Sequence, residues 1–123
     1  MSGGTESINM AILAYRGLGR EKGITRPNLL ICETGHPASF KACHYFDIDV
    51  KVVKANKNYE MDYSDMKSKI DNNTIGVYTS FPNYPYGTID PIPKIAAYCE
   101  PRGIPIHVDM CLGGFLVPFL NDP

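Results

Sequence analysis

The chain has 123 residues, of which 44% are hydrophobic and 20% are charged, and its formal net charge is -1. This length and composition predict one small globular domain and exclude a disordered or fibrous protein. Because 12 basic residues are interspersed with 13 acidic ones, nothing indicates the basic surface of a nucleic-acid binder, and we expect no nucleic-acid partner. No apolar run is long enough to span a bilayer, so we expect a soluble chain.

Short aliphatic or β-branched runs alternate along the chain with segments of helical periodicity. We expect helices at residues 5–18, 39–46, 63–70 and 92–99, and strands at residues 28–32, 49–54, 74–79 and 104–109. In the first helix, apolar residues recur at steps of three and four from Ile8 through Ile12 to Leu18, which predicts one face packed on a sheet. Strands separated by helices need crossover connections, so we predict an α/β fold whose mainly parallel sheet has helices on both faces.

Ligands of such open sheets bind beyond the carboxyl ends of the strands, so the segments that follow strands carry the candidate functional residues. His36 follows the strand at 28–32, where an imidazole can stack on a flat ring or move a proton. A solvated loop histidine is the alternative. Asp109 ends the strand at 104–109. A buried carboxylate there needs a cation or several donors, unless it only caps the following turn.

The turn Gly3-Gly4-Thr5 leads directly into the first predicted helix. Glycine lets the backbone approach a ligand closely, and the free N–H groups of a helix start favour an anion such as phosphate. A glycine-rich turn that only begins the helix would have the same sequence.

The segment from Thr79 to Pro91 is a rigid loop rich in proline and tyrosine. Its aromatic rings suit either the wall of a ligand site or an interface. At the end of this loop, Asp90-Pro91 is a typical helix start, in which the aspartate caps the free N–H groups of the helix at 92–99.

Cysteine spacing argues against a metal site or a disulfide scaffold. The cysteines are Cys32, Cys43, Cys99 and Cys111. They lack the paired spacing of zinc ligands, and Cys43-His44 has no second ligand pair nearby, so we expect no metal. We expect reduced thiols that are buried as small hydrophobic side chains.

The ordered set of motifs SGGTE, TGHPASFKACHYF, NYPYGTIDPI and HVDMCLGGFLVPF resembles the pyridoxal-phosphate enzymes of fold type I. Within that fold type it is most similar to the sphingosine-1-phosphate lyases and the related group II decarboxylases. The resemblance covers nearly the whole chain. It implies that the chain is part of the large domain of such an enzyme and that its cofactor is pyridoxal 5'-phosphate.

The resemblance also implies a role for each candidate residue. The Gly3-Gly4-Thr5 turn would bind the cofactor phosphate. His36 would stack on one face of the pyridine ring, and Cys111 would pack on the opposite face. Asp109 would pair with the ring nitrogen and keep it protonated, so that the ring accepts electrons when a bond at the substrate α-carbon breaks.

The activity implied by the resemblance is cleavage of a phosphorylated sphingoid base into a fatty aldehyde and phosphoethanolamine. The alternatives are decarboxylation of an amino acid such as glutamate, tyrosine or aspartate, or a non-catalytic α/β module that binds a phosphate-bearing ligand. The run from Tyr84 to Pro91 resembles the lyases, although Tyr86 stands where they often have histidine and Met110 where alanine is usual. The resemblance also implies that the full-length protein is a homodimer and, for a eukaryotic lyase, that it lies in the endoplasmic reticulum membrane.

Enzymes of this family attach the cofactor to a lysine some tens of residues after the HVD motif, which is beyond Pro123. Lys41 and Lys94 do not match that position. We therefore interpret residues 1–123 as a partial cofactor-binding domain without a second domain. We expect it to be inactive alone and marginally stable, because neighbouring strands would be missing from its sheet edges.

Overall fold

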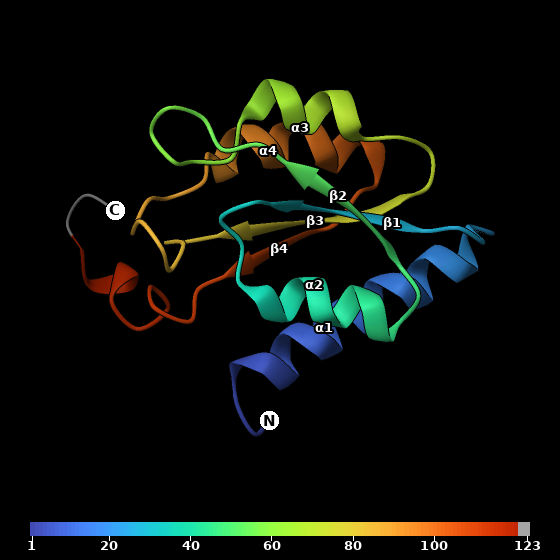
Figure 1. Cartoon of the computed structure of the whole chain (residues 1–123), viewed down its shortest axis with the longest axis horizontal. Coiled ribbons are helices and arrows are strands. Elements are labelled where there is room, and N and C mark those ends of the chain that lie inside the picture. The colour runs from blue at the N-terminus through green and yellow to red at the C-terminus, as the bar shows by residue number, and fades with distance from the viewer. Residues whose placement is uncertain (121–123) are drawn as a thin grey trace.

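A four-stranded parallel sheet is the centre of the computed structural model, which describes residues 1–120 (Figure 1). Its strands are β1 (Asn28–Cys32), β2 (Asp49–Val53), β3 (Thr74–Ser80) and β4 (Ile106–Asp109), and their order across the sheet is β2-β1-β3-β4. Every neighbouring pair is parallel. The carboxyl ends of the strands therefore meet at one edge of the sheet, where the candidate residues were expected.

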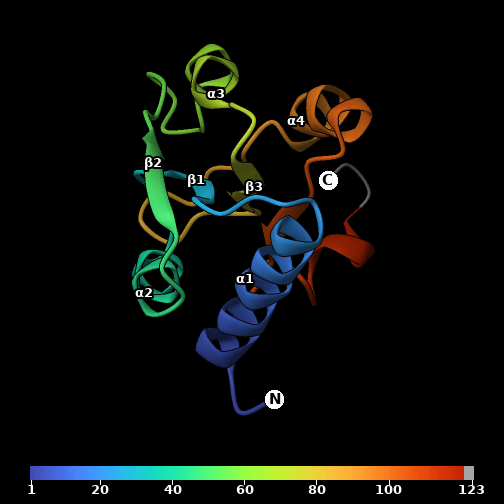
Figure 2. The same ribbon diagram turned by 90° about the vertical axis from the view of Figure 1, so that its right-hand side faces the viewer.

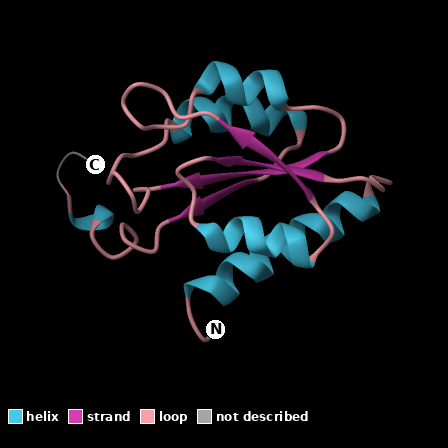
Figure 3. Ribbon diagram, viewed as in Figure 1, coloured by secondary structure: helices cyan, strands magenta, loops and turns pink. Residues whose placement is uncertain are grey.

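Helices cover both faces of this sheet, as Figures 2 and 3 show. One layer contains α1 (Gly4–Glu21) and α2 (Pro37–Tyr45), and the other contains α3 (Tyr63–Lys69) and α4 (Ile92–Cys99). Two short 3-10 helices, η1 (Glu100–Arg102) and η2 (Val117–Phe119), follow α4 and β4. The prediction of an α/β fold with a parallel sheet between two helical layers is confirmed.

Each helical layer forms its own hydrophobic core against the sheet. On the α1 and α2 side, Ile8 and Ile12 pack with Leu29 and Tyr78. The other core contains Leu30, Cys32 and Val77 of the two central strands, together with residues of α3 and α4. Because both faces are covered, every residue of β1 and β3 is buried, as is typical of central parallel strands.

The predicted apolar face of α1 is correct at Ile8 and Ile12 but wrong at its last position. Leu18 is 48% exposed, whereas the neighbouring Gly19 is buried. A Cβ added at Gly19 would lie 2.7 Å from Cγ2 of Ile75. The end of α1 therefore approaches β3 through a glycine, which a hydrophobicity pattern does not mark.

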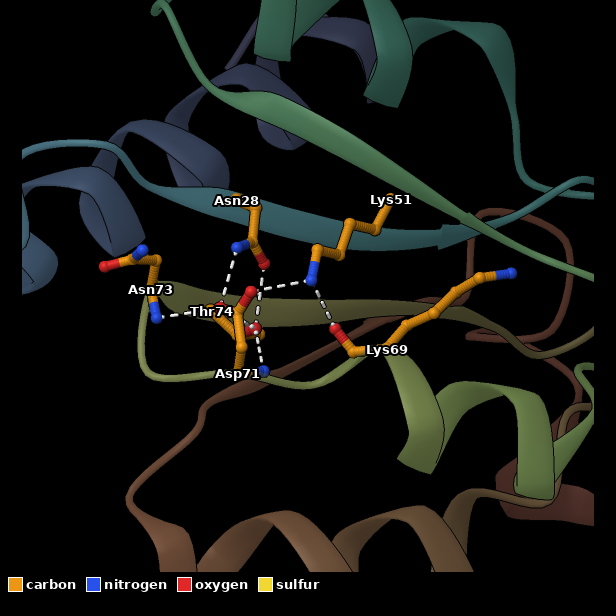
Figure 4. Close-up of polar contacts among 6 residues, drawn as sticks. All are labelled: Asn28, Lys51, Lys69, Asp71, Asn73 and Thr74. Carbon is orange, nitrogen blue, oxygen red and sulfur yellow. Dashed lines mark hydrogen bonds and ion pairs between the residues drawn. The ribbon is translucent and has the colours of Figure 1, made fainter.

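A polar cluster joins the strands at the amino edge of the sheet, opposite the candidate site (Figure 4). Asp71 accepts hydrogen bonds from Nδ2 of Asn28 at 2.9 Å and from Nζ of Lys51 at 2.6 Å. The Thr74 hydroxyl donates to Oδ1 of Asn28 at 2.8 Å. The bond from Lys51, and after it the bond from Asn28, lowers the pKa of Asp71 to about 2. The cluster fixes the starts of β1 and β3 relative to β2.

Two exposed regions remain beside the sheet. β4 is an edge strand whose four residues are only partly buried. After it, large apolar side chains are exposed, namely Leu112, Phe115, Leu116, Phe119 and Leu120. Such an accumulation of exposed apolar side chains in one short segment is typical of an interface.

Across residues 1–120, none of the helices is long and apolar enough to cross a membrane.

Candidate functional site

A pocket of about 250 Å³ lies at the carboxyl ends of β3 and β4. It is lined by His36, Ser80, Pro82, Tyr84, Asp109, Cys111 and Leu112. Three side chains singled out from the sequence, those of His36, Asp109 and Cys111, therefore lie around one cavity. A larger cavity of about 460 Å³ at the amino edge contains none of the candidate residues.

The position of Asp109 follows from the pairing of β4 with β3, in which Asp109 aligns with Ser80. Successive residues of a strand point to opposite faces, so Asp109 points to the same side as His107. Its carboxylate accepts a hydrogen bond from the hydroxyl of Tyr78 and another from the N–H of Cys111 at 3.0 Å. Asp109 therefore caps the following turn and also lines the pocket, while its pairing with a cation stays a prediction.

His36 is the N-cap of α2, because the helix begins at Pro37 and not at residue 39. Its Nδ1 accepts a hydrogen bond from the N–H of Ala38 at 3.1 Å. The ring also meets the edge of the Tyr84 ring, with centroids 5.4 Å apart. The imidazole is thus exposed but oriented, with Nε2 as its free nitrogen. This is more order than a solvated loop histidine would have.

The glycine turn at the start of α1 lies beside the same pocket. α1 begins at Gly4 with Gly3 as its N-cap, and a Cβ added at Gly4 would lie 3.8 Å from Sγ of Cys111. The first N–H groups of a helix have no partner within it and are available to an anion. None of Gly3, Gly4 and Thr5 lines the pocket itself, so the turn is a neighbour of the cavity and its role in binding a phosphate stays a prediction.

Two polar contacts occupy other groups of that turn. The N–H and hydroxyl of Ser2 donate to the Glu6 carboxylate, the N–H at 2.9 Å. The Ser7 hydroxyl donates to the carbonyl of Gly3 at 3.0 Å. The turn is therefore ordered by its own side chains.

The loop after β3 is built around the buried amide of Asn83. Its Nδ2 donates to Oγ1 of Thr88 at 2.6 Å and to the carbonyl of Tyr59 at 3.1 Å, while its Oδ1 accepts from the N–H of Tyr86 at 3.0 Å. The rings of Tyr59 and Tyr86 stack with centroids 4.1 Å apart. Because Tyr86 is held against Tyr59, only Tyr84 of the two loop tyrosines lines the pocket.

The predicted capping role of Asp90 is wrong. α4 has Pro91 as its N-cap and no side-chain capping bond. The Asp90 carboxylate is instead buried, and it accepts hydrogen bonds from the N–H groups of Met61 and Ser80, both at 2.8 Å. Burial raises the pKa of Asp90. Asp90 thus joins the end of β3 to Met61, which lies 29 positions before Asp90 in the sequence, and a local capping pattern does not reveal this contact.

Tyr78 is a site residue that sequence reasoning missed. Its side chain is only 1% exposed, its ring stacks on that of His107 with centroids 5.3 Å apart, and its hydroxyl donates to Asp109. Burial first, and then the bond to Asp109, raise the pKa of Tyr78, so the phenol stays protonated. Strand alternation would have placed Tyr78 on the face of Asp109 if the register of β3 and β4 had been known.

The cysteines divide into two kinds. Cys32, Cys43 and Cys99 are free, buried and part of the cores, which confirms their role as small hydrophobic side chains. Burial raises the pKa of the Cys43 thiol to about 12. For Cys111 the expectation of burial is wrong, because this residue follows the end of β4 and is exposed at the pocket.

The two lysines considered from the sequence lie elsewhere. Nζ of Lys41 is 5.6 Å from the ring centroid of Tyr45 on α2, and Nζ of Lys94 is 5.0 Å from that of Tyr63 in the other helical layer. Neither lysine lines the pocket.

The groups around this pocket fit one kind of ligand. The Asp109 carboxylate lies among lining residues that include no lysine or arginine, so a protonated nitrogen on the ligand would complement it. The His36 ring offers a flat surface, and the start of α1 offers N–H groups to an anion. A flat, cationic heterocycle with an anionic substituent, which describes pyridoxal phosphate, matches this donor set.

Comparisons with known proteins agree with one another. The family described as aminotransferase class-V matches residues 1–113. Sphingosine-1-phosphate lyase 1 of Rattus norvegicus is 49% identical over 120 residues, which are 98% of this chain and 21% of the relative. The solved sphingosine-1-phosphate lyase of Burkholderia pseudomallei superposes with a TM-score of 0.92 at 43% identity, over 95% of this chain and 27% of that one.

A probable L-tyrosine/L-aspartate decarboxylase of Methanosphaerula palustris is 37% identical over 122 residues, 99% of this chain and 33% of the relative. The chain thus spans about a fifth to a third of the length of these relatives.

Proposed function

The chain belongs to the class-V aminotransferase family, and on that premise we propose that it is the cofactor-binding region of a pyridoxal-phosphate-dependent carbon-carbon lyase. The substrate would be a phosphorylated sphingoid base, and the products a fatty aldehyde and phosphoethanolamine. The observation that carries the proposal is the pocket that brings His36, Asp109 and Cys111 together in a chain 49% identical to a sphingosine-1-phosphate lyase. Both this family and those lyases depend on pyridoxal phosphate.

Each site residue has a role in this proposal. The Asp109 carboxylate pairs with the protonated ring nitrogen, while the His36 imidazole packs on one ring face and Cys111 on the other. The N–H groups of the Gly3-Gly4-Thr5 turn bind the phosphate. Bound in this way, the cofactor supplies an electron sink for the bond that breaks at the substrate α-carbon.

The protein side of the site limits how the cofactor is held. Nδ1 of His36 is already an acceptor for the N–H of Ala38, so the imidazole contributes its ring face and Nε2. The Asp109 carboxylate is already an acceptor for the N–H of Cys111 at 3.0 Å. These fixed groups orient the ring without needing to rearrange when it binds.

Amino-acid decarboxylation is the second candidate, because a decarboxylase is also similar to this chain, at 37% identity. Several lyases have a higher identity, such as the 49% of the Rattus norvegicus enzyme, which favours carbon-carbon cleavage. The deciding experiment incubates the natural full-length protein either with a phosphorylated sphingoid base or with glutamate, tyrosine or aspartate. Fatty aldehyde from the first substrate supports the lyase, and carbon dioxide from an amino acid supports the decarboxylase.

Asp109→Asn is the control, since it removes the proposed partner of the ring nitrogen and should abolish the product. A wild-type protein that gives neither product would support a non-catalytic phosphate-binding module.

Three finer expectations belong to the same proposal. Residues 1–123 would form part of the cofactor-binding large domain. The full-length protein would form a homodimer, which sedimentation of that protein tests. It would also reside at the endoplasmic reticulum membrane in a eukaryotic cell, which imaging of a tagged full-length protein tests.

A further inference from the structure

Tyr78 is a buried polar residue that contacts the site and has no role in the proposed function. Its hydroxyl donates to Oδ2 of Asp109, while Oδ1 of the same carboxylate accepts from the N–H of Cys111 at 3.0 Å. Both oxygens are therefore held by donors that belong to the protein. The Tyr78 ring is itself fixed, because it is 1% exposed and stacked on His107.

The geometry points to Tyr78 as a positioning residue that orients the Asp109 carboxylate toward a cationic ring nitrogen, an inference that rests on the proposed function. A carboxylate oxygen accepts more than one hydrogen bond, so a bond from Tyr78 leaves room for the ligand. The terminal torsion of an aspartate is broad. Without the phenol, the N–H of Cys111 alone would hold the carboxylate, and it would turn away from the pocket for part of the time.

The surrounding titratable groups favour this role. Burial is the main cause that raises the pKa of Tyr78, and Asp109, Cys111 and Asp90 raise it further, so the phenol remains a donor. Burial also lowers the pKa of His107, so the stacked imidazole is neutral near pH 7. The other titratable residues that line the pocket with Asp109 and Cys111 are His36 and Tyr84.

The test compares Tyr78→Phe with Tyr15→Phe in the natural full-length protein. Tyr78→Phe keeps the ring and its stacking but removes the hydroxyl. Tyr15 is a matched control because it is partly buried in the same core as Tyr78. Pyridoxal phosphate should bind Tyr78→Phe about 10-fold more weakly, equivalent to about 1.4 kcal/mol, because a hydrogen bond to a charged group is lost. Tyr15→Phe should bind with wild-type affinity.

A second measurement does not need the cofactor. Proton NMR of the unloaded protein should show a downfield hydroxyl resonance that is lost in Tyr78→Phe, moves upfield in Asp109→Asn because the acceptor loses its charge, and is unchanged in Tyr15→Phe. Wild-type affinity in Tyr78→Phe, or a spectrum that Asp109→Asn leaves unchanged, would overturn the role of Tyr78 but not the proposed function. A wild-type protein that does not bind pyridoxal phosphate would overturn the proposed function and this role together.

Discussion

Gly113→Ala is expected to distort the turn that carries one wall of the pocket. A Cβ at residue 113 would lie 2.3 Å from the carbonyl oxygen of Phe81, whereas Cβ contacts below 3.0 Å are essentially never seen. The turn must therefore move by at least 0.7 Å, the difference between these distances. Phe81 cannot easily yield, because its N–H donates to the Asp109 carbonyl at 2.8 Å.

Overpacking of this kind costs about 1–3 kcal/mol. Thermal unfolding of the natural full-length protein, followed by circular dichroism, should show the loss as a lower midpoint. Because Cys111 lies in the same turn, binding of pyridoxal phosphate should weaken as well. The control is Gly17→Ala, where an added Cβ would meet nothing within 4 Å. This substitution should raise the free energy of unfolding by about 0.5–1 kcal/mol, because alanine favours the helix more than glycine does. If Gly113→Ala matches the wild type in midpoint and affinity, the close approach to Phe81 does not constrain the site.

Two further predictions concern buried and paired carboxylates. Asp90→Asn replaces one of the two acceptor oxygens by an amide NH2 group and leaves the N–H of Met61 or Ser80 unsatisfied. The free energy of unfolding should fall by about 1–3 kcal/mol in a urea titration, and an unchanged urea midpoint would contradict the two bonds. The hydrogen bond from Lys51 lowers the pKa of Asp71 from 3.8 to about 2, so its stabilisation is present above pH 3.8 and is lost as the pH falls through about 2. Because the Asp71 side chain is 44% exposed, solvent screening keeps this contribution below about 1 kcal/mol. Asp71→Asn should remove the loss of stability in acid, and acid unfolding curves of identical shape for the variant and the wild type would refute this prediction.

The sequence was sufficient for the fold because each strand has a strong local signal. The apolar run from Asn28 to Cys32 and the stretch from Thr74 onward were predicted as strands, and both are fully buried in the centre of the sheet. The last strand begins at Ile106 and not at residue 104. The apolar character of Ile104 reflects packing on the core of α3 and α4, which a strand also requires, so the pattern alone could not locate the boundary.

The positions of His36 and Asp109 after strands were sufficient to predict that both lie at the carboxyl edge of the sheet. Their meeting in one pocket with Cys111 follows from the order and parallel direction of the strands. The contact of Tyr78 with Asp109 spans 31 positions and depends on the register between β3 and β4. The bonds of Asp90 likewise depend on tertiary contacts, and there the local signal of a helix cap pointed to the wrong partner.

The account is tested most directly by an experimental structure of the natural full-length protein with pyridoxal phosphate bound. We expect an oxygen of Asp109 within hydrogen-bonding distance of the ring nitrogen, the His36 imidazole against one face of the ring, and the phosphate at the N–H groups that follow Gly3. A cofactor bound at another edge of the sheet, or one whose ring nitrogen faces away from Asp109, would contradict it.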